Sequence, residues 1–310
     1  MMSAEVMTCC ACCGKAEVDE VKLKICTACK LVKYCSVECQ KDHRSQHKKA
    51  CKKRMAEIRD DRLFTQPDES HLGECPICFL PLPLDTSKWT TYTCCSKRVC
   101  TGCCYANITK EFKEGRKPRC PYCREDLPET QEETDQNEKE RVKKNCPLAI
   151  FQMGEKRLKE RDYEGAIQYY TKAAALGDAD AHHNLSGLYY EGRGIYIEKD
   201  MKKQLYHLEE AAIGGHPKAR FNLGVYEERN GRHERAVKHY IIAAKLGDDD
   251  ALEGVKKGFQ RGLVSKEDYA ASLRGHQAAV DATKSKQREE TYALLKKELG
   301  AGLERLGDRL

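Results

Sequence analysis

The chain has 310 residues, 19 cysteines and a formal net charge of +6, with 34% charged and 40% hydrophobic residues. This composition excludes one large packed globule and favours several small domains with thin cores. No apolar run reaches the roughly 18 residues that a membrane span needs, so we expect no membrane partner. Every cysteine lies between Cys9 and Cys146, which predicts that the two halves of the chain fold on different physical principles.

The cysteines are best interpreted as metal ligands. The first residues, MMSAEVMTCC, have neither a basic region nor an apolar core, so we expect no secretory signal and a reducing compartment, cytoplasmic or nuclear. A C-x-x-C turn points two thiolates at one tetrahedral zinc ion about 2.3 Å away. This spacing recurs at Cys10 and Cys13, Cys26 and Cys29, Cys75 and Cys78, Cys100 and Cys103, and Cys120 and Cys123.

The first cysteine block, residues 9–51, adds two pairs with i, i+4 spacing, which place both side chains on one face of a helix. The stretch YCSVECQKDHRSQHKKAC, residues 34–51, resembles the MYND-type zinc finger, and the resemblance covers residues 10–51. It implies two interleaved zinc sites, one formed by Cys10, Cys13, Cys35 and Cys39 and the other by Cys26, Cys29, His47 and Cys51.

This block offers two alternative ligand choices, Cys9 with Cys12 and His43 in place of His47, and one departure from the family pattern. Cys9 and Cys12 have the same spacing as the first pair, but Gly14 suits the tight turn after Cys13 and favours Cys10 with Cys13. We interpret His43 as an exposed helix residue. Arg44 stands where the MYND family often has tryptophan, at its usual peptide-docking surface.

Residues 52–73 are expected to form a basic helical linker. Nine basic and four acidic residues lie between Lys41 and Arg62, without interleaved aromatic residues. We therefore expect a solvated helix face there and do not expect nucleic-acid binding.

The second block, residues 74–125, resembles a RING-type zinc finger through ECPICF, TCCSKRVCTGCC and CPYCR. The resemblance implies a cross-braced fold in which Cys75, Cys78, Cys100 and Cys103 hold one zinc. Cys120 and Cys123 belong to the other zinc, where Lys97 replaces the usual histidine. An all-cysteine site with Cys94 and Cys95 completes that set, and Cys104 remains the alternative to Cys94.

Ligase-type RING fingers have no catalytic nucleophile, so no catalytic residue is predicted. They bind a ubiquitin-conjugating enzyme (E2) and align its ubiquitin thioester for attack. The resemblance implies that Ile77 and Pro121 contact the conjugating enzyme and that Arg124 holds ubiquitin. The expected function is a RING-type E3 ubiquitin ligase, with the alternative of a non-enzymatic protein-interaction adaptor.

Residues 126–146 are expected to be a charged linker, either solvated or helical, that lets the zinc half and the repeat half move relative to each other. From residue 147 to residue 262 the sequence repeats itself, because equivalent segments start at Ala149, Ala181, Ala219 and Ala251. Their periods of 32, 38 and 32 residues predict a solenoid of helical hairpins. The segment His183–Ala219 resembles Sel1-like relatives of tetratricopeptide repeats, which implies binding of protein partners.

Residues 263–310 are expected to be a polar capping helix that runs into a frayed tail, with Ser265 and Asp268 opening the helix. The predicted fold class is multi-domain: two small zinc-stapled fingers, MYND and cross-brace RING, followed by an all-α helical-hairpin repeat solenoid. Sixteen ligands predict four zinc ions, two in each finger.

Overall fold

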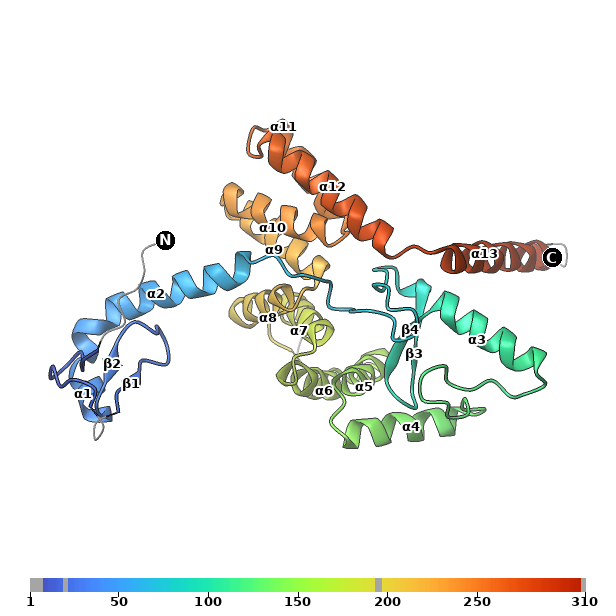
Figure 1. The fold of residues 1–310 in the computed structure, drawn as a ribbon, viewed down its shortest axis with the longest axis horizontal. Helices are drawn as coiled ribbons and strands as arrows, with labels where there is room; N and C mark the ends of the chain where they lie inside the picture. The colour runs from blue at the N-terminus through green and yellow to red at the C-terminus, as the bar shows by residue number, and fades with distance from the viewer. Residues whose placement is uncertain (1–7, 19–21, 193–196, 308–310) are drawn as a thin grey trace. The chain divides into compact units, whose positions relative to one another are not determined.

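The computed structural model describes residues 8–18, 22–192 and 197–307 and divides into two compact units, Met1–Thr65 and Gln66–Leu310 (Figure 1). Each unit has its own core. Within the described ranges, every helix is too short or too polar to span a bilayer.

The first unit is a small finger that continues into a long helix. It consists of strands β1 (Lys24–Ile25) and β2 (Lys33–Tyr34), which pair antiparallel, and helices α1 (Val37–Asp42) and α2 (Arg44–Phe64). The Ser36 side chain caps α1 by accepting a hydrogen bond from the N–H of Cys39. The sequence predicted a separate helical linker at residues 52–73, but α2 runs without a break from the finger to Phe64.

The second cysteine block begins the second unit. Its elements are the 3-10 turn η1 (Thr86–Lys88), the antiparallel strands β3 (Trp89–Tyr92) and β4 (Lys97–Cys100), and helix α3 (Thr101–Lys113). Its buried core contains five cysteines, Cys75, Cys100, Cys103, Cys104 and Cys120, and three other residues, Leu82, Tyr92 and Val99. A core this small is not enough to stabilise a fold without a metal or another staple.

The charged segment after this block forms helix α4 (Gln131–Lys143), and Thr130 caps it by accepting a hydrogen bond from the N–H of Glu133. Lys156 on the next helix forms an ion pair of 2.8 Å with Asp135. Residues 126–146 therefore do not separate a zinc half from a repeat half. Instead, the division into units falls at Thr65, and the second cysteine block shares its unit with the repeats.

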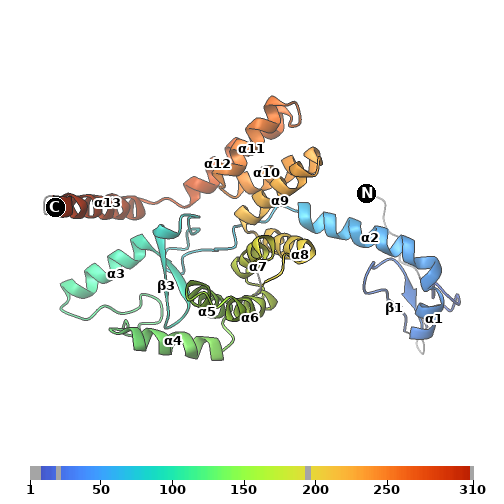
Figure 2. The same ribbon diagram turned by 180° about the vertical axis from the view of Figure 1, so that it is seen from behind.

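The repeats form paired helices that follow one another in chain order (Figures 1 and 2). The helices are α5 (Pro147–Lys159), α6 (Tyr163–Ala175), α7 (Ala179–Glu191), α8 (Met201–Ile213), α9 (Pro217–Arg229), α10 (His233–Lys245) and α11 (Asp249–Gln260). Helix α5 packs on α6, α7 on α8, and α9 on α10. The predicted solenoid of helical hairpins is confirmed.

Small residues allow the two helices of a hairpin to approach closely. A Cβ atom at Gly154 would lie 2.6 Å from the ring of Tyr170, and one at Gly224 would lie 2.4 Å from the ring of Tyr240. Both tyrosine rings are buried. Glycine at these two positions is therefore required for the packing of a buried aromatic ring against a neighbouring backbone.

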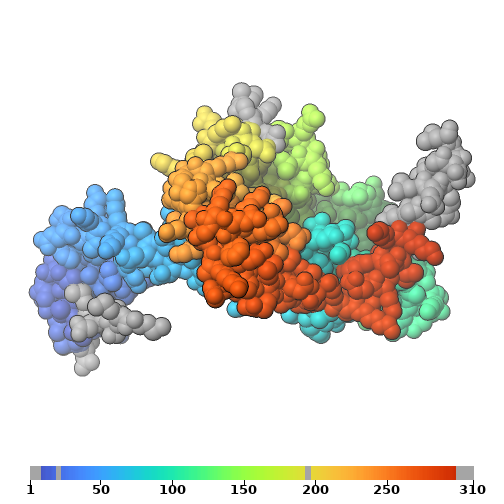
Figure 3. Space-filling view, turned by 90° about the horizontal axis from the view of Figure 1, so that it is seen from above, coloured from blue at the N-terminus to red at the C-terminus, as the bar shows by residue number. Residues whose placement is uncertain are grey.

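The C-terminal segment forms two helices, α12 (Lys266–Ala282) and α13 (Lys286–Gly307), in place of the single helix that the sequence predicts. The frayed tail predicted near Leu310 lies outside the described residues. Helix α12 packs on α10 and α11. Helix α13 packs on α3 of the second cysteine block, and Figure 3 shows the red segment beside the green one. The C-terminal segment thus contacts both the repeats and the cysteine block.

Candidate metal centres

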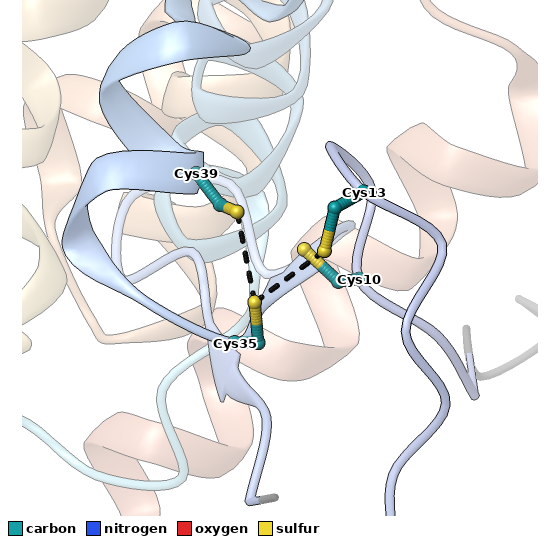
Figure 4. Close-up of side chains that lie close together, drawn as sticks. All are labelled: Cys10, Cys13, Cys35 and Cys39. Carbon is teal, nitrogen blue, oxygen red and sulfur yellow. Dashed lines mark hydrogen bonds between the residues drawn. The ribbon is translucent and has the colours of Figure 1, made fainter.

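The first group of ligand atoms belongs to the hairpin before β1, the end of β2 and helix α1, and it consists of Cys10, Cys13, Cys35 and Cys39 (Figure 4). The Sγ atom of Cys35 lies 3.5 Å from that of Cys13 and 3.6 Å from that of Cys39. Four sulfurs around one zinc ion at about 2.3 Å stand about 3.8 Å apart, whereas the sulfurs of a disulfide are about 2 Å apart. The spacing fits a tetrahedral metal site.

Backbone hydrogen bonds around Cys10 favour its function as a metal ligand. The N–H of Gly14 donates a hydrogen bond of 2.9 Å to the carbonyl of Cys10, and Gly14 has a φ of +73°, where a side chain would be strained. Burial raises the pKa of the Cys10 thiol, but hydrogen bonds from the backbone of Cys13 and Cys35 outweigh it and lower the pKa to about 6. These hydrogen bonds therefore favour the thiolate form of Cys10, the form that binds zinc.

The second group joins the turn between β1 and β2 to helix α2, and it consists of Cys26, Cys29, His47 and Cys51. The Nε2 atom of His47 lies 3.2 Å from the Sγ atom of Cys29. His43 lies outside the group, because its Nδ1 atom is 3.1 Å from the hydroxyl of Tyr34. His43 is half-buried, and the sequence interpretation of it as an exposed helix residue is wrong.

The third group surrounds the start of α3 and consists of Cys75, Cys78, Cys100 and Cys103. The Sγ atoms of Cys78 and Cys100 are 3.8 Å apart. The sulfur of Cys100 also caps α3, because it accepts a hydrogen bond of 3.5 Å from the N–H of Cys103. The N–H of Cys100 in turn donates to the sulfur of Cys75 at 3.5 Å.

The fourth group consists of Cys94, Cys95, Cys120 and Cys123. The sulfur of Cys95 lies 3.8 Å from that of Cys120, and the sulfur of Cys123 lies 3.4 Å from that of Cys94. Cys104, the alternative to Cys94, is buried, and its sulfur lies 2.9 Å from the hydroxyl of Tyr92. The structure therefore brings Cys94 into the group and places Cys104 in the core beside it.

The two blocks share one topology. In each, the first and third ligand pairs form one group, and the second and fourth pairs form the other. The remaining cysteines lie outside the four groups: Cys9, Cys12, Cys104 and Cys146. Interleaved groups connect distant parts of a short chain, so a metal bound in them contributes directly to folding.

A fifth group, which sequence reasoning missed, consists of His71, Asp180 and His216. The Nε2 atom of His71 lies 2.9 Å from Oδ1 of Asp180, and Nε2 of His216 lies 3.6 Å from the same oxygen. The other carboxylate oxygen accepts a hydrogen bond of 2.6 Å from Arg98. The ring of His183 stacks on that of His216 at 4.4 Å.

This fifth group has hydrogen-bonding roles that leave it poorly suited to a metal. The Nδ1 atom of His216 accepts a hydrogen bond of 3.2 Å from the N–H of Ala219 and so caps α9. A neutral imidazole that accepts at Nδ1 carries its hydrogen on Nε2, which then has no lone pair for a metal. One signal existed in the sequence, because His216 occupies the capping position that Asp178 and Asp248 hold in the flanking repeats.

The residues predicted to contact a conjugating enzyme differ in accessibility. Ile77 is 37% exposed. Arg124 is exposed, and its guanidinium donates a hydrogen bond of 3.3 Å to the side chain of Asn107 on α3. Pro121, however, is buried. Of the three predicted contact residues, the structure therefore presents two at the surface.

Comparison with known proteins identifies two kinds of module. The sequence model of the MYND finger family matches residues 10–51. The model of the Sel1 repeat matches residues 147–178, 179–216 and 217–248, and these lengths reproduce the periods found in the sequence. The zinc-finger and repeat assignments made from the sequence are confirmed in these two regions.

The relatives share only parts of the chain. Chitin synthase regulatory factor 4 of Schizosaccharomyces pombe is 33% identical over 89 residues, which is 28% of this chain and 14% of that protein. A Sel1 repeat protein from Oxalobacter formigenes gives a TM-score of 0.36 at 26% identity over 39% of this chain and 96% of that one. A protective antigen of uropathogenic Escherichia coli with an SLR fold gives a TM-score of 0.40 at 20% identity over 48% of this chain and 34% of that one. The chain thus contains a MYND-type zinc finger at residues 10–51 and three Sel1 repeats over residues 147–248.

Proposed function

We propose that this protein is a RING-type E3 ubiquitin ligase in which the second cysteine block positions a ubiquitin-loaded conjugating enzyme. The observation that carries the proposal is the interleaving of two four-cysteine groups around α3, with Ile77 and Arg124 at the surface. Such a ligase needs no nucleophile of its own. Its contribution is to hold the thioester of the conjugating enzyme in a reactive orientation.

The proposal includes four zinc ions for each chain, one in each of the four groups that contain cysteine. Spacings of 3.4–3.8 Å between sulfurs support zinc in three of these groups. The Cys29–His47 spacing of 3.2 Å supports it in the fourth. Thiolate and imidazole ligands in a tetrahedral arrangement are typical of structural zinc. Thiolate ligands of this kind persist in a reducing compartment, so we place the protein in the cytoplasm or the nucleus.

The surface proposed for the conjugating enzyme is apolar beside the first ligand pair. Ile77 lies between the two cysteines, and Phe79, directly after the second, is 70% exposed. Large exposed apolar side chains close together are typical of protein interfaces. Since Pro121 is buried, we propose that contact depends on Ile77 and Phe79, with Arg124 directed to ubiquitin.

The MYND finger and the repeats are proposed to select substrates or complex partners. The repeats offer a groove of about 520 Å³ between α7, α8 and α9, lined in part by Tyr190, Met201 and Tyr226. Tyr190 and Met201 are more than half exposed. Aromatic and methionine side chains are enriched in protein interfaces, which supports binding of a protein segment here.

A ubiquitin-discharge assay tests the ligase activity. The purified chain should release ubiquitin from at least one loaded conjugating enzyme of a panel, and Ile77→Ala and Arg124→Ala should slow the release. Leu176→Ala, at an exposed position in the repeats, and Lys113→Ala, at the end of α3, are matched controls that should keep the full rate. Equal rates for all five proteins would exclude the ligase.

The second candidate function is a non-enzymatic adaptor in which all three modules bind proteins. One observation favours it: Asn107, at the position where an aromatic residue often contacts the conjugating enzyme, is hydrogen-bonded to the carbonyl of Arg119 and to Arg124. The second of these bonds engages Arg124, the arginine that would otherwise hold ubiquitin. The same discharge assay separates the two functions, because an adaptor would bind partners without accelerating discharge.

A further inference from the structure

The last described helix, α13, inserts one buried cation into the second cysteine block. Arg288 is 1% exposed, although its side chain carries a positive charge. Its guanidinium donates hydrogen bonds to the sulfur of Cys78 at 3.2 Å, to the carbonyl of Leu80 at 3.1 Å and to that of Pro81 at 2.8 Å. A fourth bond, of 2.7 Å, reaches the carbonyl of Thr283, in the turn before α13.

The residues around Arg288 leave space for its side chain and hold α13 in place. Gly102, on the first turn of α3, has no side chain, and a Cβ atom there would lie 3.1 Å from both Cα and Cγ of Arg288. The carbonyl of Gly102 accepts a hydrogen bond of 3.1 Å from Gln287. The hydroxyl of Tyr292, one turn further along α13, lies 3.5 Å from the carbonyl of Lys88. The helix is therefore positioned on the block by contacts on both sides of Arg288.

The charge of Arg288 matches the chemistry of the group that it contacts. Four thiolates around one Zn²⁺ carry a net charge of −2, and burying that charge is costly unless it is compensated. Arginine is the cation suited to a buried site, because it remains charged and donates several hydrogen bonds in fixed directions. Hydrogen bonds to ligand atoms also fix their orientation and increase metal affinity.

We infer that Arg288 is a positioning residue for the zinc held by Cys75, Cys78, Cys100 and Cys103, and that α13 is an integral part of that zinc site. Arg288 acts through the sulfur of Cys78, whose negative charge it stabilises and whose direction it fixes. The backbone bonds to Leu80 and Pro81 hold the ligand loop in place. This inference rests on the zinc assignment made under the proposed function, but it does not depend on ligase activity.

Three variants of the full chain separate the contributions. Arg288→Met removes the charge and the donors but keeps much of the length. Arg288→Lys keeps the charge and loses the fork of donors. Gln287→Ala removes a neighbouring contact between α13 and α3 that does not involve sulfur. Arg274→Met, at an exposed position on α12, is the control for loss of one arginine.

The experiment measures zinc transfer to a chromophoric chelator and, after exchange with Co²⁺, the sulfur-to-cobalt charge-transfer absorption. In Arg288→Met, one of the four ions should bind about 10- to 100-fold more weakly, with a shifted absorption for that site. Arg288→Lys should recover part of the affinity, Gln287→Ala should lose much less affinity than Arg288→Met, and Arg274→Met should behave as the wild type. An equal loss in Gln287→Ala and Arg288→Met would overturn the inference, because helix packing alone would then explain both.

The outcomes also distinguish this inference from the zinc assignment. A wild-type chain with fewer than four zinc ions would contradict the assignment. A wild-type chain with four ions and an Arg288→Met variant with unchanged affinity and absorption would contradict the role of Arg288 alone. Far-ultraviolet circular dichroism of the repeat helices identifies any variant that has failed to fold.

Discussion

The imidazole of His71 lies 2.9 Å, through its Nε2 atom, from the carboxylate of Asp180 on α7. Arg98, on β4 of the cysteine block, donates to the same carboxylate at 2.6 Å. The backbone N–H of His71 also donates a hydrogen bond of 3.0 Å to the backbone carbonyl of Gly215 in the repeats. The Asp180 carboxylate therefore joins the repeat array to the second cysteine block through Arg98 and to the segment before that block through His71.

Replacing His216 by asparagine tests how the buried histidine beside this carboxylate affects the pH dependence of folding stability. Burial, together with repulsion from His71 and His183, lowers the pKa of His216 to about 2, so the folded residue stays neutral. The unfolded residue titrates near a pH of about 6.5. Below that pH only the unfolded chain takes up a proton at this position, because the folded pKa is depressed. The free energy of unfolding is therefore highest above a pH of about 6.5 and falls by about 2 kcal/mol between pH 7 and pH 5.

Asparagine can also cap α9 but does not titrate, so His216→Asn should flatten the pH dependence of stability by this amount. Urea unfolding at pH 7, 6 and 5 in excess zinc measures the slope. His233→Asn, at an exposed position, should leave the slope of the wild type unchanged. An identical slope in His216→Asn and the wild type would show that His216 becomes protonated in the folded state.

Two glycines of the repeats should respond to alanine in opposite directions. A Cβ atom at Gly154 would lie 2.6 Å from the buried ring of Tyr170, and this overpacking should cost about 1–3 kcal/mol. A Cβ atom at Gly187, on α7, meets nothing within 4 Å. Gly187→Ala should therefore raise stability by about 0.5–1 kcal/mol, because alanine loses less backbone entropy in a helix.

Thermal and urea unfolding of both variants, followed by circular dichroism of the helices, measure the difference. The pair controls for helix propensity, since both substitutions change glycine to alanine inside a helix. Stabilisation by Gly154→Ala would mean that Tyr170 moves aside easily and that the close approach of α5 and α6 is not required.

The ligand pairs could be predicted because each pair is local in the sequence. A C-x-x-C turn or an i, i+4 pair fixes the direction of two side chains without any knowledge of the fold. How the pairs combine followed from resemblance to known fingers, and the structure brings the same pairs together. The repeats could be predicted equally well, since their small residues recur in the sequence at a regular period.

Contacts between distant segments could not be predicted in this way. Arg288 lies more than 200 residues from Cys78, and no motif in the sequence of α13 marks this arginine as buried. His71 and Asp180 belong to segments without a common motif. Burial of a charged side chain depends on the packing of both partners, and no periodicity in either segment records it.

Replacing either Cys94 or Cys104 by serine tests which of the two cysteines belongs to the fourth group of ligands. The sulfur of Cys94 lies 3.4 Å from that of Cys123, whereas the sulfur of Cys104 lies 2.9 Å from the hydroxyl of Tyr92. Cys94→Ser should therefore reduce the zinc content from four ions to three. Cys104→Ser should keep four, because a hydroxyl can replace the thiol as the partner of Tyr92.

Elemental analysis of purified protein after dialysis against a weak chelator measures this content. The two variants control for each other, since both remove one thiol from the same core. Loss of an ion in Cys104→Ser, with four retained in Cys94→Ser, would exchange the roles of the two cysteines and contradict the observed grouping.

Zinc removal should affect the C-terminal helix as well as the fingers. Binding of zinc contributes folding free energy only where the ligands lie, so a strong chelator should unfold both cysteine blocks and leave α5–α11 helical. Helix α13, however, is bound to the second block through Arg288 and Gln287. Its amides should therefore lose protection from hydrogen exchange together with those of α3.

Mass spectrometry of exchanged peptides, with and without chelator, measures this directly. Helix α12 is the internal control, since it precedes α13 in the chain but packs on α10 and α11, so its exchange should change little. Protection of residues 286–297 that survives chelation would show that α13 docks independently of zinc. Parallel loss of protection in α3 and α13 would mean that the cysteine block and the C-terminal helix unfold as one unit, because local unfolding follows groups of elements that stabilise one another.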